Sequence, residues 1–190
     1  MCEYVGRFNT QERIALKNMI RNVCRCTLGL LGTVLFLSAP STQAADLAPP
    51  TDKVLLTVQG AITKTNANKV ALFDRQQLEQ LGLHKLVTSN PFIEGIHTFE
   101  GPLLSAVLDQ VGAKGETLEA HALDGYNVDI PITNVRTYPV ILAMKMDGKV
   151  MQVRSKGPLW IIYPVDQFDD LKSETFSGHS IWQLTTLTVK

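Results

Sequence analysis

The chain has 190 residues, of which 45% are hydrophobic, and its 18 basic and 18 acidic side chains give a formal net charge of +0. This apolar fraction is typical of a packed globular core and argues against a disordered chain. No run of lysine or arginine stands out, so the sequence lacks the basic surface that a nucleic-acid-binding protein needs, and we expect no nucleic-acid partner.

The first 44 residues have the order of a secretory signal peptide. Arg21 and Arg25 precede a 12-residue apolar run over residues 28–39, and small residues follow up to Ala44. Because a membrane-spanning helix needs about 20 apolar residues, this pattern favours a cleaved signal over a retained anchor. No Arg-Arg pair precedes the run. We therefore expect export by the general secretory route, cleavage near Ala44 and a periplasmic protein, with Met19 as a possible true start.

The cysteines all lie in this same segment, as Cys2, Cys24 and Cys26. Residues 45–190 therefore contain no thiol for a disulfide, a metal site or a nucleophile. Five basic and two acidic residues also lie within residues 1–44, so the remaining 146 residues carry a net charge near −3. That length is typical of a single domain.

The mature chain is expected to begin with a flexible leader, residues 45–52, which contains two prolines. The domain then covers residues 53–190. Residues 54–58 are predicted to form a short strand that ends before Gly60, and residues 63–69 are predicted to form a polar loop.

Two helices are predicted. Asp74 is a good N-cap for the first, which carries Leu78 and Leu81 and ends at Gly82. The second covers residues 102–111, where proline suits the first turn and a glycine follows the last. Four apolar residues of this segment are spaced 0, 3, 4 and 7 apart and so share one helix face: Leu104, Val107, Leu108 and Val111.

The rest of the chain is predicted to form strands. Asp-Gly pairs at 124–125 and 147–148 each separate two β-type segments, which is a strong hairpin signal. Residues 159–163 are predicted as a buried strand between two prolines, and residues 184–189 as the last strand. Two helices and about seven strands predict a single α+β domain with a mixed or antiparallel sheet.

Common catalytic signatures are absent: the sequence has no GxSxG, HExxH, P-loop or GxGxxG motif. The histidines, His84, His97, His121 and His179, lie far apart, and none pairs at metal-ligand spacing. His121 alternates with apolar neighbours, so we expect a half-exposed strand residue there. The residues by themselves therefore do not indicate an enzyme.

Five sequence blocks follow one another in a characteristic order. They are FxGPLLSAVLDQVGA from Phe99, ALDGYNVDIPI from Ala122, ILAMKMDGKVM from Ile141, GPLWIIYP from Gly157 and IWQL from Ile181. Together they resemble the molybdopterin-binding domain of the sulfite oxidase family, whose members share an FxGxxL helix, a DGY hairpin, an LAxxxxG hairpin, a GxPLRxxxP strand and a closing strand with a KW pair. The resemblance covers residues 54–190. It implies a mixed α+β domain that holds a pterin in a surface cleft.

Three departures from the family pattern argue against a molybdenum centre. The family's metal-ligating cysteine lies in a stretch similar to residues 86–92, which here offers Thr88, Ser89 and Asn90. A neutral hydroxyl or amide is a poor substitute for a soft thiolate. The arginine expected after GPL is replaced by Trp160, and the lysine expected before the closing tryptophan is replaced by Ile181. Export in an unfolded state also argues against delivery with a cofactor assembled in the cytoplasm.

The resemblance then implies a binding protein. Small exported proteins of this subgroup look like pterin-binding sensory proteins, and some are thought to be partners of membrane-bound cyclic-di-GMP enzymes. We predict a non-enzymatic periplasmic protein that binds a pterin without a covalent cofactor and relays its occupancy to the periplasmic domain of a membrane signalling protein. Two alternatives remain open. One is a residual molybdopterin-dependent oxidoreductase whose metal is held by the pterin dithiolene, and the other is a ligand-free interaction module.

A pterin needs an aromatic face to stack on and polar groups that bind its donor and acceptor edge. Trp160 is the predicted stacking platform, although a core tryptophan explains it equally well, and Trp182 is predicted to lie in the core. Turn, loop and solvent-exposed roles remain the alternatives for the other candidates. These candidate ligand-binding residues lie at the first Asp-Gly hairpin, before Gly157 and around the missing cysteine: Asp124, Tyr126, Arg154, Ser155, Lys156, Ser89, Asn90 and His97.

Overall fold

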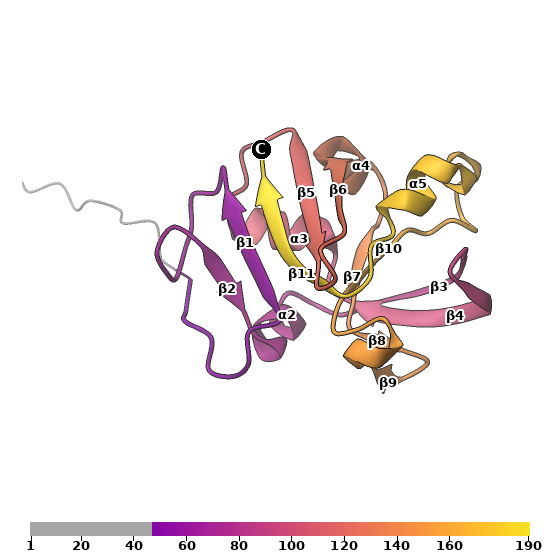
Figure 1. The fold of residues 1–190 in the computed structure, drawn as a ribbon, viewed down its shortest axis with the longest axis horizontal. Coiled ribbons are helices and arrows are strands. Elements are labelled where there is room, and N and C mark those ends of the chain that lie inside the picture. The colour runs from indigo at the N-terminus through magenta and orange to yellow at the C-terminus, as the bar shows by residue number, and fades with distance from the viewer. Residues whose placement is uncertain (1–46) are drawn as a thin grey trace, which may run out of the picture. The chain divides into compact units, whose positions relative to one another are not determined.

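The structure is a computed structural model, and it describes residues 47–190. The predicted signal peptide, its cleavage point, the possible start at Met19 and the first two leader residues lie outside the described residues. Within the described part the chain forms eleven strands, four α-helices and two short 3₁₀ helices (Figure 1). None of these helices is long and apolar enough to cross a membrane.

A five-stranded mixed sheet forms the centre of the domain. Its strand order is β2-β1-β11-β5-β6, in which β1 and β11 run parallel and every other neighbouring pair runs antiparallel. The mixed α+β domain predicted from the sequence is therefore confirmed. The five strands are β1 (Leu56–Gly60), β2 (Ala71–Phe73), β5 (Thr117–Ala122), β6 (Asn127–Pro131) and β11 (Leu184–Val189).

Helix α3 (Leu104–Gln110) packs on one face of this sheet (Figure 1). Leu104, Val107, Leu108 and Val111 are all fully buried, which confirms the helix face predicted from their spacing. They join the main hydrophobic cluster with residues of β1, β5 and β11. Because each fully buried aliphatic side chain contributes about 1.5–3 kcal/mol, this cluster is the main source of stability.

Helix α2 (Arg75–Gln80) begins where the sequence predicted it. Asp74 caps it, since its Oδ1 accepts a hydrogen bond from the Gln77 amide (2.9 Å), and its own amide donates to the Gln77 side chain (3.0 Å). Asp74 Oδ2 also accepts from the Thr51 amide at 2.8 Å. These bonds, led by that from Gln77, hold the pKa of the Asp74 carboxyl below its usual value. The cap therefore also ties the end of the leader to the domain.

A second sheet, with the order β3-β4-β8-β9, is antiparallel throughout. Its strands are β3 (His84–Asn90), β4 (Ile93–Gly101), β8 (Lys145–Met146) and β9 (Lys149–Val150). It packs on a smaller hydrophobic cluster that includes Trp160 of β10 (Trp160–Ile162), which pairs with β7 (Ile141–Ala143). Gly101 ends β4 so close to the Leu142 carbonyl that a Cβ could not be accommodated there.

The two predicted Asp-Gly hairpins are both present. One joins β5 to β6 and the other joins β8 to β9. Asp147 and Gly148 have φ values of 50° and 74°, the pair of left-handed conformations that a two-residue type I′ turn requires. Aspartate and glycine are among the residues that adopt this conformation at least cost.

Several elements were not predicted. They include strand β2 and the hairpin of β3 and β4, which contains residues 86–92. For Ser89, Asn90 and His97 in this hairpin, a loop was the alternative to a ligand-binding role. Helices α4 (Ile132–Thr137) and α5 (Glu174–His179) were also missed. Both helices are six residues long, which is too short for a helical period to emerge from the apolar pattern. The buried face of β3 alternates Leu86 with the polar Thr88 and Asn90, so hydrophobicity does not reveal that strand.

Candidate ligand-binding site

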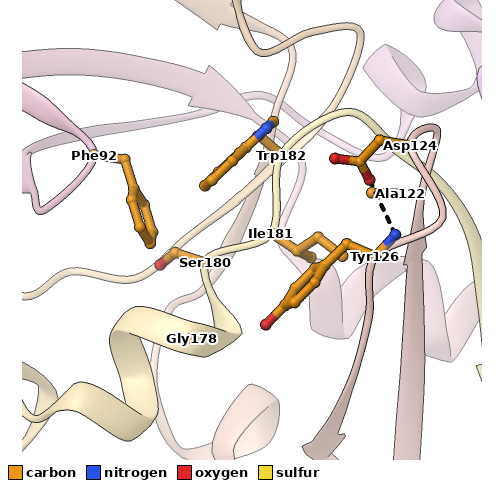
Figure 2. A pocket seen from close by; sticks show the side chains of 8 residues that line it. All are labelled: Phe92, Ala122, Asp124, Tyr126, Gly178, Ser180, Ile181 and Trp182. Atoms are coloured by element: carbon orange, nitrogen blue, oxygen red, sulfur yellow. Dashed lines mark hydrogen bonds between the residues drawn. The ribbon is translucent and has the colours of Figure 1, made fainter.

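A pocket of about 300 Å³ opens where three separate segments meet. The turn between β3 and β4 contributes one side, the β5–β6 turn contributes the opposite side, and the segment from α5 to β11 lies between them (Figure 2). Its lining residues are Phe92, Ala122, Asp124, Tyr126, Gly178, Ser180, Ile181 and Trp182.

The aromatic side of the pocket consists of Phe92 and Trp182. Their ring centroids lie 4.8 Å apart with an interplanar angle of 66°, an edge-to-face contact. The Phe92 amide donates to Asn90 Oδ1 at 3.0 Å, which fixes the turn that carries the phenyl ring. Neither ring is fully buried, so both offer surface to a ligand.

Lys156 lies against this aromatic wall. Its Nζ is 4.2 Å from the centre of the Trp182 ring, 5.3 Å from that of Trp160 and 5.9 Å from that of Phe92. The Lys156 backbone is left-handed (φ 65°), and its carbonyl accepts from the Gln183 amide at 3.1 Å. An ammonium over an indole face is worth about 0.5–2 kcal/mol, so Lys156 stabilises the orientation of Trp182.

The opposite side of the pocket carries a carboxylate. Asp124 Oδ1 accepts from the Tyr126 amide at 3.0 Å, a short-range bond that shapes the β5–β6 turn (Figure 2). Within the described residues no hydrogen bond engages Asp124 Oδ2. Tyr126 is exposed beside it. The pocket thus places a carboxylate oxygen with accepting capacity across from two aromatic rings.

Trp160 lies behind the pocket and not in its lining. It is fully buried, its indole Nε1 donates to the Ser180 carbonyl at 3.1 Å, and its ring packs edge-to-face on Phe99 at 5.6 Å. The structure therefore matches the core alternative for Trp160 that the sequence left open. Trp182, which was predicted to lie in the core, is the tryptophan that lines the pocket. In the sequence both lie in short apolar segments, so composition does not distinguish them.

The residues of the stretch that lacks the cysteine are held in internal contacts. Asp166 accepts from the Ser89 amide at 2.6 Å and from Ser89 Oγ at 2.7 Å, and Thr88 Oγ1 lies 3.5 Å from the same carboxylate. These hydrogen bonds, led by that of the Ser89 backbone, hold the pKa of Asp166 below its usual value. Ser89 and Asn90 lie in β3 next to the turn that bears Phe92, but neither lines the pocket.

The remaining candidates, His97, Arg154 and Ser155, also lie outside the pocket lining. His97 Nδ1 is 2.8 Å from Asp147 Oδ2, and its Nε2 is 2.8 Å from the Glu94 carbonyl. The bond to Asp147 is the main reason why the pKa of His97 is raised. Arg154 and Ser155 belong to a short 3₁₀ helix, Val153–Ser155, where Ser155 Oγ accepts from the Gln152 amide at 3.2 Å.

His179 and Phe176 of α5 form an aromatic cluster with the buried Tyr163. His179 Nδ1 and the Tyr163 hydroxyl have no hydrogen-bond partner there. Burial lowers the pKa of His179 and raises that of Tyr163. Burial thus favours the neutral form of His179, whose neighbours in sequence, Gly178 and Ser180, line the pocket.

The side chains that could act as metal ligands can be compared with those that a molybdenum centre needs. Residues 47–190 contain no cysteine, and no group of three or more histidine, aspartate or glutamate side chains within that range could hold a metal. The hydroxyls of Thr88 and Ser89 are engaged by Asp166. These residues do not fit a molybdenum ion that needs a protein thiolate. The pocket does fit a flat heterocycle, because it offers aromatic surface and a carboxylate.

Comparison with known proteins places the chain in a family. Residues 62–167 match the family model of the oxidoreductase molybdopterin binding domain. Because this match covers more than half of the 190 residues, the chain belongs to that family. The matched range includes Phe92, Asp124 and Tyr126, whereas Trp182 lies beyond it. No curated protein matches the chain.

A solved structure shows the same fold. The sulfane dehydrogenase SoxCD from Paracoccus pantotrophus matches with a TM-score of 0.53 and 17% sequence identity. The match covers 70% of this chain and 37% of the SoxCD chain. The match therefore spans a little over a third of the length of that SoxCD chain, and the likeness establishes the fold alone.

Proposed function

We propose that this protein is an exported, non-enzymatic pterin-binding protein that relays the occupancy of its pocket to the periplasmic domain of a membrane signalling protein. The pocket carries the proposal, because the free oxygen of Asp124 lies across from the rings of Phe92 and Trp182. Membership of a molybdopterin-binding family supports the choice of ligand. The signal-peptide pattern of residues 1–44 supports the location.

The chemistry of a pterin suits this arrangement. Its fused ring is flat and presents a face that aromatic side chains can contact, and one edge carries an amino group next to a ring N–H. A carboxylate that accepts both donors holds such an edge in one orientation. A volume of about 300 Å³ is at the lower end of the range for small-molecule sites, which suits a bicyclic ring better than a large cofactor.

A binding role also agrees with the groups that this chain supplies. No thiolate is available in residues 47–190, and the hydroxyls of residues 88 and 89 are engaged by Asp166. The polar groups around the pocket can therefore bind and orient a ring, but they offer no ligand set for a redox metal. The open, partly aromatic lining favours a ligand-binding protein over a ligand-free interaction module, since a module needs no such surface.

Pterin titration with a matched pair of variants tests the proposal. Asp124→Asn replaces the accepting carboxylate with an amide, and we expect about tenfold weaker pterin binding because charge-assisted hydrogen bonds contribute roughly 1.5–3 kcal/mol. Asp129→Asn is the control, since Asp129 lies on the same hairpin, pairs with Lys190 and does not line the pocket. Pterin fluorescence and calorimetry give both affinities.

Three results would contradict this function. The first is a purified protein that binds no pterin, and the second is equal affinity in the two variants. The third is stoichiometric molybdenum in protein isolated from its native host, which would favour the residual oxidoreductase. If the protein bound no pterin and Trp182→Ala altered only stability, the ligand-free module would be favoured.

A further inference from the structure

Strand β3 is the outermost strand of the second sheet. The strand order β3-β4-β8-β9 leaves one side of β3 without a strand partner among residues 47–190. The strand is seven residues long, which is long for an edge strand. Strand β4 pairs with its other side only. An edge of this kind presents backbone donors and acceptors that can pair with another chain.

The register identifies which backbone groups face outward. The carbonyls of Thr98 and Glu100 in β4 accept from the amides of Asp147 and Met144, both at 2.8 Å, so they point toward β8. Their partners in β3 are Val87 and Lys85. In an antiparallel ladder the two residues of such a pair point their backbone groups away from each other. The amides and carbonyls of Lys85 and Val87 therefore face the open side.

The side chains beside this edge suit a partner strand. Val87 is 58% exposed and Ile96, diagonal to it across the hairpin, is 68% exposed. Val87 and Ile96 lie on the same face of the hairpin. Ser89 shares a face with Val87, two residues away in the strand, and Ile96 is the residue directly opposite Ser89. The Lys85 side chain is 71% exposed and only loosely paired with Glu100 at 3.6 Å.

The open part of the edge has a defined end. The Ser89 amide, which would be the next outward donor, is already bonded to Asp166 Oδ2 at 2.6 Å. The Asp166 side chain therefore occupies the position that a longer partner strand would need. The backbone groups that are free to pair are therefore those of Lys85 and Val87. This open segment ends just before the turn that contributes Phe92 to the pocket.

A second copy of this chain fits the edge poorly. An antiparallel pairing of two β3 strands centred on Val87 would require the Ser89 amide, which Asp166 already engages. A pairing centred on Leu86 would make the two Lys85 side chains diagonal neighbours, about 7–8 Å apart, and like charges there are unfavourable. A different chain with an acidic side chain opposite Lys85 has neither disadvantage.

We propose that the open edge of β3 binds an extended segment of another protein, which adds a strand beside Lys85 and Val87. The segment carries an acidic residue opposite Lys85 and an apolar residue that covers Val87 and Ile96. Backbone pairing supplies affinity, and these two side-chain preferences supply selectivity. This inference rests on the proposed function, because it assigns the surface through which the signalling partner contacts the protein.

A substitution of one outward amide tests the inference. Val87→Pro removes the outward N–H of β3 but no bond of the β3–β4 ladder, and proline is tolerated at such edge positions. Val87→Ile keeps both the amide and an apolar, β-branched side chain, and it is the matched control. A display library of random 12-residue peptides is selected against the full exported chain and against both variants. We expect the wild type and Val87→Ile to enrich acidic, partly apolar sequences that bind Val87→Pro about tenfold less well.

Charge reversal gives a second, independent measurement. Lys85→Glu keeps every backbone group, so we expect its selected peptides to carry a basic residue where those of the wild type carry an acidic one. Equal binding to Val87→Pro and wild type, no enriched sequence, or an unchanged charge preference would overturn the inference. Sedimentation that showed a wild-type dimer lost in Val87→Pro would also overturn it, in favour of self-pairing. Pterin titration of the same variants, expected to be unchanged, separates this failure from a failure of the proposed function.

Discussion

The central sheet and the β3–β4 hairpin are held in place by different forces. The strands of the central sheet bury apolar side chains against α3, and the main hydrophobic cluster extends across them. The hairpin buries Leu86 and Phe99, but it also buries the polar Thr88 and Asn90 and leaves Val87 and Ile96 exposed. It is attached through Asp166 and the smaller cluster.

This difference separates stability from binding. The pocket takes Phe92 from the hairpin, while Asp124 and Tyr126 come from the edge of the central sheet. One wall is therefore carried by the exposed β5–β6 turn of the central sheet, and the other belongs to a hairpin held by the smaller cluster and by the contact with Asp166. Regions with fewer buried apolar contacts open at lower free-energy cost, so the hairpin wall is the side that can respond to a ligand.

The largest expected effect lies in the central region. Leu108 of α3 is fully buried in the main cluster. Leu108→Ala should lower the free energy of unfolding by about 2–5 kcal/mol because it leaves a cavity. Val87→Ala in the exposed face of the hairpin should change it by less than about 0.5 kcal/mol. Urea denaturation of both variants measures the contrast, and equal losses would show that the hairpin carries as much of the core as α3.

The sequence predicted the central region much better than the hairpin. Spacing revealed the buried face of α3, Asp74 marked the start of α2, and the Asp-Gly pairs located two turns. These signals are local, because each depends on residues within one or two turns of chain. The β3 strand has no comparable signal, since its buried positions include the polar residues Thr88 and Asn90. Thr88 contacts Asp166, which lies far away in the sequence.

The same limit applies to the site. Asp124 and Tyr126 were selected from the DGY turn and line the pocket. Phe92 and Trp182 were not selected, because they are 90 residues apart and meet only when β3–β4 and the segment before β11 pack together. The assignment of all nine candidates as ligand-binding residues stays a prediction. Trp160 was expected to contact the ligand and Trp182 to lie in the core, whereas Trp182 lines the pocket and Trp160 is buried. Both rings belong to the smaller cluster, and the sequence does not indicate on which side of it each ring lies.

An intermediate effect is expected from the contact that anchors the hairpin. Asp166→Asn replaces an acceptor-only carboxylate, which accepts from the Ser89 amide and hydroxyl, with an amide that has one acceptor oxygen. We expect a loss of about 1 kcal/mol in unfolding free energy and faster hydrogen exchange at residues 84–101 than in the central strands. Asp169→Asn is the control, because its partner is the exposed Lys172. If exchange accelerated uniformly, the hairpin would not be a separate unit.

The smallest effect concerns two histidines whose pKa values shift in opposite directions. Contact with Asp147 raises the pKa of His97 in the second sheet from 6.5, whereas burial lowers the pKa of His179 at the end of α5 from the same value. The stability that protonated His97 contributes is fully present below pH 6.5 and is lost as pH rises through its raised folded pKa. For His179 the folded state binds the proton more weakly than the unfolded state, so stability falls as pH drops below 6.5 toward its lowered folded pKa.

These two dependences can be separated by substitution. His97→Gln should remove the loss of stability toward high pH and keep the loss of stability toward low pH. His179→Gln should have the opposite effect on the pH profile. It should also lower stability at every pH, because it buries an amide. Urea midpoints measured between about pH 5 and 8, where histidine titrates, give both profiles. If His97→Gln kept the decline at high pH, the His97–Asp147 contact would not be coupled to folding.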